Sequence, residues 1–383
     1  MVDLGGEREF INMRKQIRLL SISILIIVLY ITSNNAFSCS AFLMKGKNYC
    51  VVGFNENWKS MPGIVVVNKR GIVKKNLSWN FLVSEDKPLE PGIEWISKYG
   101  SVSFNLLGLD LPCYGVNEKG LFIVELYLDR TFSLEDSLKP KMFWGQWIQF
   151  QLDNYATVNE LVEGLENTCV IDWWPTFPGS HFFVSDKEGN TAAVELINGK
   201  FQVSSGKNMP VPILCNRPYQ NELKNVERYK AFGGGEIFNL YSQGWNARFP
   251  KAAHLVKNYS VATGISPVSY AWNVLDSIKP GDWQLVADVQ NNILYFRSDQ
   301  GKKIKSINIS KCDFSKNNEV KFIDINSNSQ GDITNQLSKL TPEINDEYVM
   351  KGFPIGYENP QFYNSNKYAN LKKNLHNYVI DKL

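Results

Sequence analysis

Histidine is the residue type that this sequence lacks most clearly. Only three occur in 383 residues, at His181, His254 and His376. They lie far apart, without cysteine or carboxylate at the spacing of zinc ligands, and a Ser-His-Asp triad would need one beside its nucleophile. The sequence therefore predicts neither a metal centre nor a histidine-based hydrolase. It also predicts no cofactor, since the glycine run 233–235 lacks the Lys-Ser/Thr ending of a phosphate loop.

An excess of charge of one sign is also missing. Lysine and arginine number 41 against 38 aspartates and glutamates, a net charge of +3, and no basic block or arginine-rich stripe occurs. Nucleic acid is therefore not expected as a partner, because phosphate neutralisation needs such a surface. The hydrophobic content of 44% is enough for a sizeable core.

The apolar run near the N-terminus is too short for a membrane span. Residues 19–31 are mostly apolar, whereas a bilayer needs about 20 residues. Arg14, Lys15 and Arg18 precede the run, and Ala36-Phe37-Ser38 offers a small-x-small cleavage site. This pattern predicts a secretory signal peptide over residues 1–38 and an exported protein, periplasmic or extracellular, with no stable membrane span after cleavage.

Six cysteines are too few for a disulfide scaffold in a chain of this length, and their pairing stays open. Cleavage after Ser38 would make Cys39 the first residue. An N-terminal cysteine carries a thiol and an α-amine whose ordinary pKa is about 7.7 to 8.0. The amine can accept the proton of the thiol near neutral pH, so one residue supplies nucleophile and base for acyl transfer.

Bacterial lipoproteins also begin at a cysteine after signal cleavage. Their recognition site usually has leucine three residues earlier, where this chain has Ala36, followed by bulky Phe37. An acylated Cys39 would have lost both its amine and its thiol. A lipid-anchored chain could then only bind or scaffold.

Short strands with tight turns alternate with pairs of helices along the chain. Predicted strands are 64–68, 101–105, 114–128 with a turn at 117–120, a meander over 181–185, 191–196 and 200–204, and 283–289, 292–297 and 302–309; helices are predicted around 144–152, from Thr157, and over 266–278. This order indicates an α+β domain with mainly antiparallel sheets. We assign residues 39–325 to it. Residues 326–383 are rich in Asn, Lys and Ser and are predicted as a C-terminal extension without clear order.

Several motifs then follow one another in a characteristic order. They are Cys39-Ser-Ala-Phe, 53–58 (GFNENW), 114–121 (YGVNEKGL), 185–189 (SDKEG), 214–218 (LCNRP), 247–249 (ARF) and 295–297 (YFR). The chain resembles the choloylglycine hydrolase family, the N-terminal-nucleophile linear amide hydrolases that include bile salt hydrolases and penicillin V acylases. The resemblance extends from about Cys39 to Phe322. It implies a four-layer α-β-β-α fold, a small-molecule N-acyl amide substrate, and the possibility of a homo-oligomer.

The resemblance also implies roles for individual residues. Cys39 falls on the nucleophile, Asn216 on the oxyanion-hole asparagine, Tyr127 on the second oxyanion position and Arg248 on the active-site arginine. Asn57 falls where the family has an aspartate that contacts the amine and thiol of the nucleophile. These residue types suit the chemistry, because amide donors stabilise an oxyanion and a nearby cation favours thiolate.

Two positions depart from the family pattern. Phe54 replaces a basic residue, and Asn57 replaces the aspartate. A neutral hydrogen bond is worth about 0.5 to 1.5 kcal/mol against about 1.5 to 3 kcal/mol for a charged one. Two functions follow from the sequence: an exported cysteine amidohydrolase acting through Cys39, or a catalytically weakened or lipid-anchored binding protein of the same fold.

Overall fold

The computed structural model describes residues 38–85, 92–128, 138–171, 179–242 and 244–383. Ser38 to Leu383 form one compact unit. The predicted signal peptide lies outside the described residues apart from Ser38. Within the described residues, no helix combines the length and the apolar character that a membrane crossing requires.

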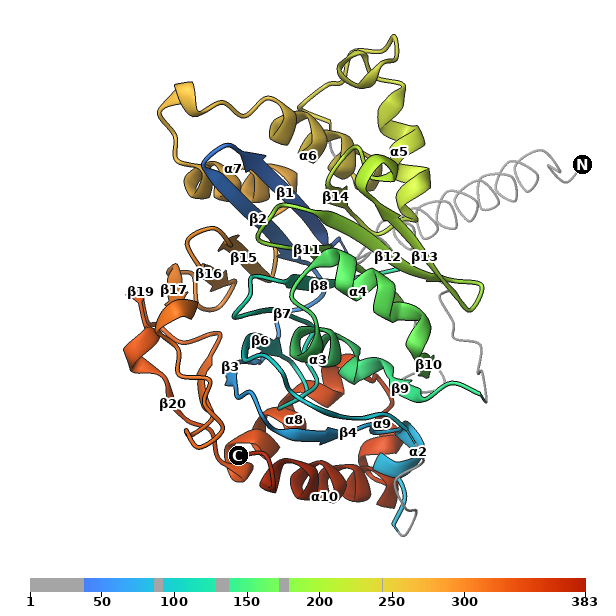
Figure 1. The fold of residues 1–383 in the computed structure, drawn as a ribbon, viewed down its shortest axis with the longest axis vertical. Coiled ribbons are helices and arrows are strands. Elements are labelled where there is room, and N and C mark those ends of the chain that lie inside the picture. The colour runs from blue at the N-terminus through green and yellow to red at the C-terminus, as the bar shows by residue number, and fades with distance from the viewer. Residues whose placement is uncertain (1–37, 86–91, 129–137, 172–178, 243) are drawn as a thin grey trace, which may run out of the picture. The chain divides into compact units, whose positions relative to one another are not determined.

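The first sheet has seven strands in the described part of the chain. Their order is β14 (Ile213–Leu214), β1 (Ser40–Gly46), β2 (Tyr49–Glu56), β15 (Trp283–Asp288), β16 (Ile293–Ser298), β17 (Lys305–Asn308) and β19 (Gly331–Asp332). Helices α6 (Arg248–Lys257) and α7 (Pro267–Ile278) pack on β1, β2, β14 and β15, and α5 (Tyr219–Glu227) packs on α6. In Figure 1 the strands β1 and β2 are blue, β14 is green, and β15 and β16 are brown.

The second sheet has nine strands among the residues that the structure describes. Their order is β13 (Lys200–Ser205), β12 (Thr191–Ile197), β11 (Ser180–Ser185), β8 (Phe122–Tyr127), β7 (Tyr114–Asn117), β6 (Ser101–Asn105), β3 (Ile64–Asn68), β18 (Lys321–Asp324) and β20 (Ser338–Lys339). Helix α3 (Trp144–Asn154) packs on β7 and β8, and α4 (Val158–Gly164) follows it. Smaller elements are α2 (Trp79–Leu82) and the pairs β4 (Val73–Lys75) with β5 (Glu94–Ile96) and β9 (Lys141–Phe143) with β10 (Cys169–Ile171).

Aromatic side chains join the two sheets face to face. Tyr114 of β7 lies 5.0 Å from Phe54 of β2, 5.3 Å from Phe104 of β6 and 5.7 Å from Trp283 of β15, measured between ring centroids. All four side chains are buried. Since helices cover the outer face of each sheet, the predicted four-layer α-β-β-α fold with mainly antiparallel sheets is confirmed.

Local signals explain why several predicted elements have the bounds that the structure shows. Helix α7 begins at Pro267, where Ser266 Oγ accepts a hydrogen bond from the N–H of Ser269. Helix α4 begins after Thr157, whose Oγ1 accepts from the N–H of Glu160. The meander of β11, β12 and β13 pairs antiparallel, as predicted.

The C-terminal segment from residue 326 belongs to the same compact unit. It adds β19 to the first sheet and β20 to the second, and it forms helices α8 (Pro342–Gly356), α9 (Pro360–Tyr363) and α10 (Asn366–Ile380). Helix α10 packs on α8 and α2. Its Tyr378 hydroxyl donates to Asp110 Oδ2 at 3.1 Å, which ties the segment to a buried polar network.

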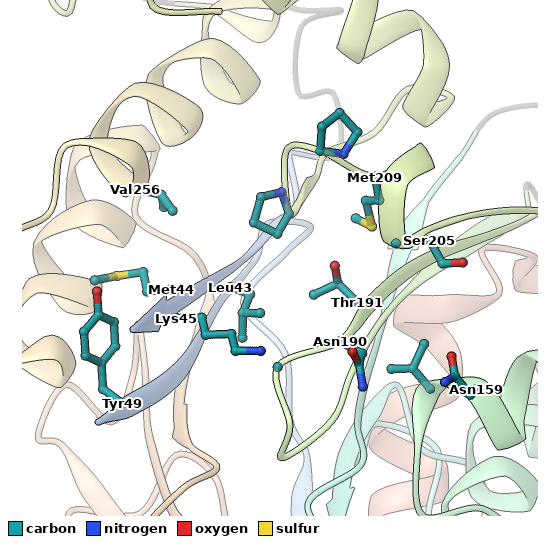
Figure 2. Close-up of a pocket in the computed structure, with 15 residues that line it drawn as sticks. Leu43, Met44, Lys45, Tyr49, Asn159, Asn190, Thr191, Ser205, Met209 and Val256 are labelled. Atoms are coloured by element: carbon teal, nitrogen blue, oxygen red, sulfur yellow. The ribbon is translucent and has the colours of Figure 1, made fainter. Parts of the chain in front are cut away.

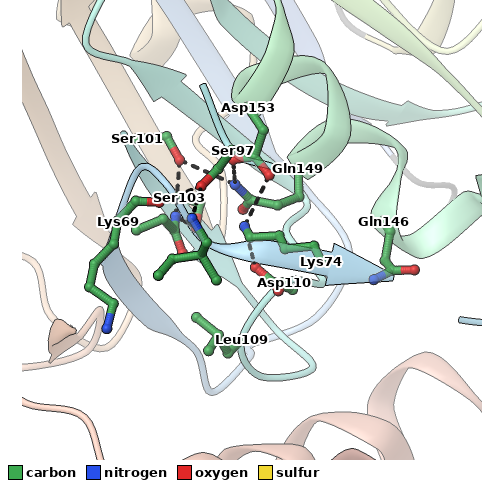
Figure 3. A network of polar contacts seen from close by, with 12 residues as sticks. Lys69, Lys74, Ser97, Ser101, Ser103, Leu109, Asp110, Gln146, Gln149 and Asp153 are labelled. Carbon is green, nitrogen blue, oxygen red and sulfur yellow. Dashed lines mark hydrogen bonds and ion pairs between the residues drawn. The ribbon is translucent and has the colours of Figure 1, made fainter. Parts of the chain in front are cut away.

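That network surrounds the ammonium of Lys74 on β4 (Figure 3). The ammonium lies 2.7 Å from Asp110 Oδ1 and 3.0 Å from Asp153 Oδ2. Asp153 also accepts hydrogen bonds from Trp95 and Gln149. Every charge in this cluster therefore has an opposite charge within hydrogen-bond distance, which is what burial of ions requires.

Candidate active site

Cys39 lies directly before β1, and its side chain is only 1% exposed. Strands β1 and β2 form a hairpin with a two-residue turn at Lys47 and Asn48. Continuing the register by one residue beyond the Ser40–Asn55 pair places Cys39 opposite Glu56, the last residue of β2. The thiol donates a hydrogen bond to Glu56 Oε1 at 3.2 Å.

Arg248 is the first residue of α6, and it is buried beside Cys39. Its Nη1 donates to the backbone oxygen of Cys39 at 2.5 Å and to Ser40 Oγ at 2.9 Å. Its Nη2 donates to Asn216 Oδ1 at 3.0 Å. One guanidinium thus joins the start of β1 to the segment after β14, using the planar fork that distinguishes arginine from lysine.

The amide of Asn216 is held at both ends. A guanidinium can only donate, so the atom that faces Arg248 must be Oδ1. This orientation turns Nδ2 toward β8, where it donates to the backbone oxygen of Tyr127 at 2.8 Å. Four of the five residues selected from the sequence, Cys39, Tyr127, Asn216 and Arg248, are therefore joined in one hydrogen-bonded chain.

Asn57 lies next to this cluster, but its side chain does not contact the thiol sulfur. Asn57 Nδ2 donates to the backbone oxygen of Ser38 at 3.4 Å, and its own backbone oxygen accepts from the N–H of Ser38 at 3.1 Å. Lys279 Nζ donates to Ser38 Oγ at 3.1 Å. The Asn57 side chain thus holds the residue that precedes Cys39, and Ser38 makes the Cys39 nitrogen an amide here.

Burial dominates the electrostatics of the site. It raises the pKa of the Cys39 thiol well above the ordinary value, and the negative charge of Glu56 adds to the effect, while the backbone N–H of Asn57 and Arg248 oppose it. Burial also raises the pKa of Glu56 to about 8, and the thiol opposes this shift. With Ser38 in place, the thiol is therefore protonated at neutral pH.

Glu56 is the residue that sequence reasoning missed. A signal was present, because a two-residue hairpin turn at Lys47 and Asn48 determines the partners of both strands. Counting outward from that turn pairs Cys39 with Glu56 and Ser38 with Asn57. Side chains of directly opposite residues share one face of a sheet, so Glu56 and not Asn57 faces the thiol.

His181 supports the site from the second sheet without touching the thiol. Its Nε2 lies 2.7 Å from the backbone oxygen of Cys215, and its Nδ1 lies 2.9 Å from Glu195 Oε1. Glu195 also accepts from the N–H of Tyr219. His181 is therefore a buried, hydrogen-bonded residue that anchors the segment carrying Asn216.

A cavity of about 540 Å³ lies at the far end of β1 (Figure 2). Leu43, Met44 and Lys45 line it together with Asn190 and Thr191 at the β11–β12 turn. None of the residues predicted for catalysis lines this cavity. Among the described residues, no group of His, Cys, Asp or Glu has an arrangement that could hold a metal ion.

Sequence comparison defines the class of protein. Residues 98–323, more than half of the chain, match the profile of the linear amide C-N hydrolases, choloylglycine hydrolase family. The chain belongs to this family and is a hydrolase of linear amide C–N bonds. The family prediction made from the motifs is confirmed.

Individual relatives agree with this assignment. A penicillin V acylase from Pectobacterium atrosepticum is 26% identical over 262 residues, an alignment that covers 58% of this chain and 69% of that protein. The structure of penicillin V acylase from Agrobacterium tumefaciens superposes with a TM-score of 0.64 at 25% identity, over 79% of this chain and 98% of that one. A variant of conjugated bile acid hydrolase from Clostridium perfringens shares the fold, with a TM-score of 0.55 at 17% identity over 74% and 96% of the two chains.

Proposed function

We propose that this chain is an exported cysteine amidohydrolase that cleaves the C–N bond of an N-acyl amide through an acyl-enzyme on Cys39. The observation that carries the proposal is the hydrogen-bonded chain from Cys39 through Arg248 and Asn216 to Tyr127. These residues come from distant parts of the sequence. Their hydrogen-bonded connection to the backbone of Cys39 supports a reaction at this residue.

Removal of residues 1–38 is the activating step in this proposal. While Ser38 is attached, the Cys39 nitrogen is an amide and cannot act as a base. Cleavage converts it into an amine on the residue that bears the nucleophile. The contacts of Ser38 with Asn57 and Lys279 would be lost in the same step.

The proposed reaction then needs no cofactor. The α-amine takes the thiol proton, the sulfur bonds to the substrate carbonyl carbon, and the carbonyl electron pair moves to oxygen. Asn216 Nδ2 has a second hydrogen beyond the one given to Tyr127, and this hydrogen is available to the oxyanion. Collapse breaks the C–N bond as the ammonium proton passes to the leaving nitrogen, and water hydrolyses the thioester.

The relatives support an N-acyl substrate, since penicillin V and conjugated bile acids are both acyl amides. We use penicillin V and glycine-conjugated cholate as probes of the two kinds. The site chemistry described above applies equally to both. The acyl preference is thus an outcome of the test.

The first experiment is the intact mass and N-terminal sequence of the exported protein, followed by hydrolysis of both probes. Cys39→Ala is expected to abolish hydrolysis while the variant still folds, with a cooperative melting transition. Cys50→Ala is the matched control, because Cys50 is another buried thiol, at the opposite end of the β1–β2 hairpin. Full hydrolysis by Cys39→Ala would refute the proposal, and a lipid mass on Cys39 would favour a binding protein.

A further inference from the structure

Glu56 is held rigidly against the nucleophile. Glu56 is the last residue of β2, which lies between β1 and β15. Its backbone oxygen accepts a hydrogen bond from the N–H of Asp282 at 2.7 Å, and Glu56 pairs with Trp283 of β15. Its carboxylate lies 3.2 Å from the sulfur of Cys39. Glu56 is 9% exposed, so this contact is shielded from water.

The groups around Glu56 are acidic or neutral. Glu125 from β8 and Asp282 before β15 add negative charge, and Cys113 and Tyr114 face the same region from β7 and the loop before it. Arg248 acts on Cys39 through the backbone oxygen of that residue, and Lys279 contacts Ser38. In the described part of the chain, Glu56 makes no ion pair, and a buried carboxylate without a counter-ion is costly.

An N-terminal Cys39 would bring the missing cation to this place. The α-amine and the sulfur of one cysteine are separated by only three bonds. A carboxylate in hydrogen-bond contact with the sulfur is therefore also near the amine. Removal of Ser38 would create an α-amine beside a buried acid that already touches the thiol. This amine is a cation when protonated, and its neutral form is the base that accepts the thiol proton.

We infer that Glu56 is a catalytic residue of this hydrolase, whose carboxylate holds both the amine and the thiol of N-terminal Cys39. The inference rests on the proposed function at Cys39. It also explains Asn57, because the carboxylate that the family has at that position is supplied one residue earlier, on the face of β2 that carries the thiol. Proton transfer from sulfur to nitrogen then proceeds beside a fixed anion that stabilises the ammonium produced.

The variant Glu56→Gln distinguishes this catalytic role from a structural one, because it should raise the alkylation rate of Cys39 and lower the rate of hydrolysis. Removing the negative charge lowers the pKa of the thiol, so iodoacetamide should alkylate Cys39 faster at pH 7. Peptide mass mapping measures the extent of alkylation at Cys39. Hydrolysis of penicillin V should fall at least tenfold, because the neutral amide of glutamine holds the amine more weakly than a carboxylate does. Asp282→Asn is the matched control, since it removes a neighbouring acid that does not touch the sulfur.

All variants are compared as chains that begin at Cys39, produced from an initiator methionine that the cell removes. Equal alkylation profiles and equal hydrolysis for Glu56→Gln and wild type would overturn the inference. Hydrolysis that persists in Cys39→Ala would instead overturn the proposed function. The alkylation profile needs no substrate, so the two failures are distinguishable. Should Glu56→Gln not fold, Glu56→Asp is measured in its place, with slower hydrolysis expected and wild-type behaviour in both readouts contradicting the inference.

Discussion

Two buried polar clusters in this protein differ in how they balance charge. Around Lys74, one ammonium faces two carboxylates, and neutral donors from Trp95 and Tyr378 complete the network. Around Cys39, the carboxyl group of Glu56 faces a thiol, and the neighbouring acids Glu125 and Asp282 add negative charge where a counter-ion would be needed. The charges of the first cluster are paired in the folded chain, whereas in our proposal Glu56 gains a counter-ion only when cleavage exposes the α-amine of Cys39.

Loss of the Lys74 cation should strongly lower the stability of the folded protein. Lys74→Met leaves Asp110 and Asp153 buried without their partner, and breaking a buried pair in this way costs about 3 to 5 kcal/mol. Urea unfolding at pH 7 measures the loss. Lys75→Met is the control, because Lys75 and Glu94 form an exposed pair at 3.7 Å, worth about 0 to 1 kcal/mol. Equal losses in the two variants would contradict this view of the cluster.

Arg248 should affect turnover more than stability. Arg248→Lys keeps the charge but cannot reach Cys39, Ser40 and Asn216 with one planar fork. The amide of Asn216 then loses its fixed orientation, and loss of one oxyanion donor typically lowers kcat by about 10² to 10³. Steady-state hydrolysis of penicillin V measures the effect. Arg297→Lys, a change at an arginine that pairs with Asp276, should leave the rate within about twofold.

The pH dependence of stability should reveal the uncompensated acid. In the chain that retains Ser38, the pKa of Glu56 is about 8, above the ordinary value of about 4.3 for glutamate. The folded chain therefore binds more protons than the unfolded chain between these values, and its stability falls as pH rises through this window. Urea midpoints between pH 5 and 8 should fall less steeply for Glu56→Gln.

The same measurement can be made on a chain without Ser38, and the two pH profiles of stability compared. A chain beginning at Cys39 carries an ammonium that lowers the pKa of Glu56, so its stability should also fall less with pH than that of the longer chain. Glu94→Gln controls for a surface carboxylate, since Glu94 is exposed and pairs with exposed Lys75. Parallel pH profiles for the long and short chains would show that the amine does not reach Glu56.

Asn57→Asp should have the smallest effect. The family pattern suggested that aspartate at this position would raise activity. The side chain contacts Ser38 and not the sulfur, so the change should alter hydrolysis by less than about threefold in a chain that begins at Cys39. A tenfold gain would mean that residue 57 and not Glu56 supplies the missing carboxylate.

Local sequence determined much of the fold. The Ser266-Pro267 pair marked the first turn of α7, and the turn at 117–120 separated β7 from β8, because caps and turns depend on a few adjacent residues. The C-terminal segment carries the same kind of local signal at Thr341-Pro342, the cap and first residue of α8, but its packing depends on distant partners. Its helices α8 and α10 contact each other, and Asn345 Oδ1 accepts from the N–H of Leu109, a partner distant in sequence.

The sequence by itself marked Cys39, Asn216 and Arg248 as residues of the candidate site, because each lies in one of the ordered motifs, but it did not mark Glu56. Only the tertiary structure decided what each side chain faces. The register of β1 and β2 places Glu56 against the thiol and Asn57 against Ser38. A shift of one residue in either strand would exchange the two faces. Burial then set the charge state of the site, since desolvation depends on all the elements that cover a group and not on its neighbours in sequence.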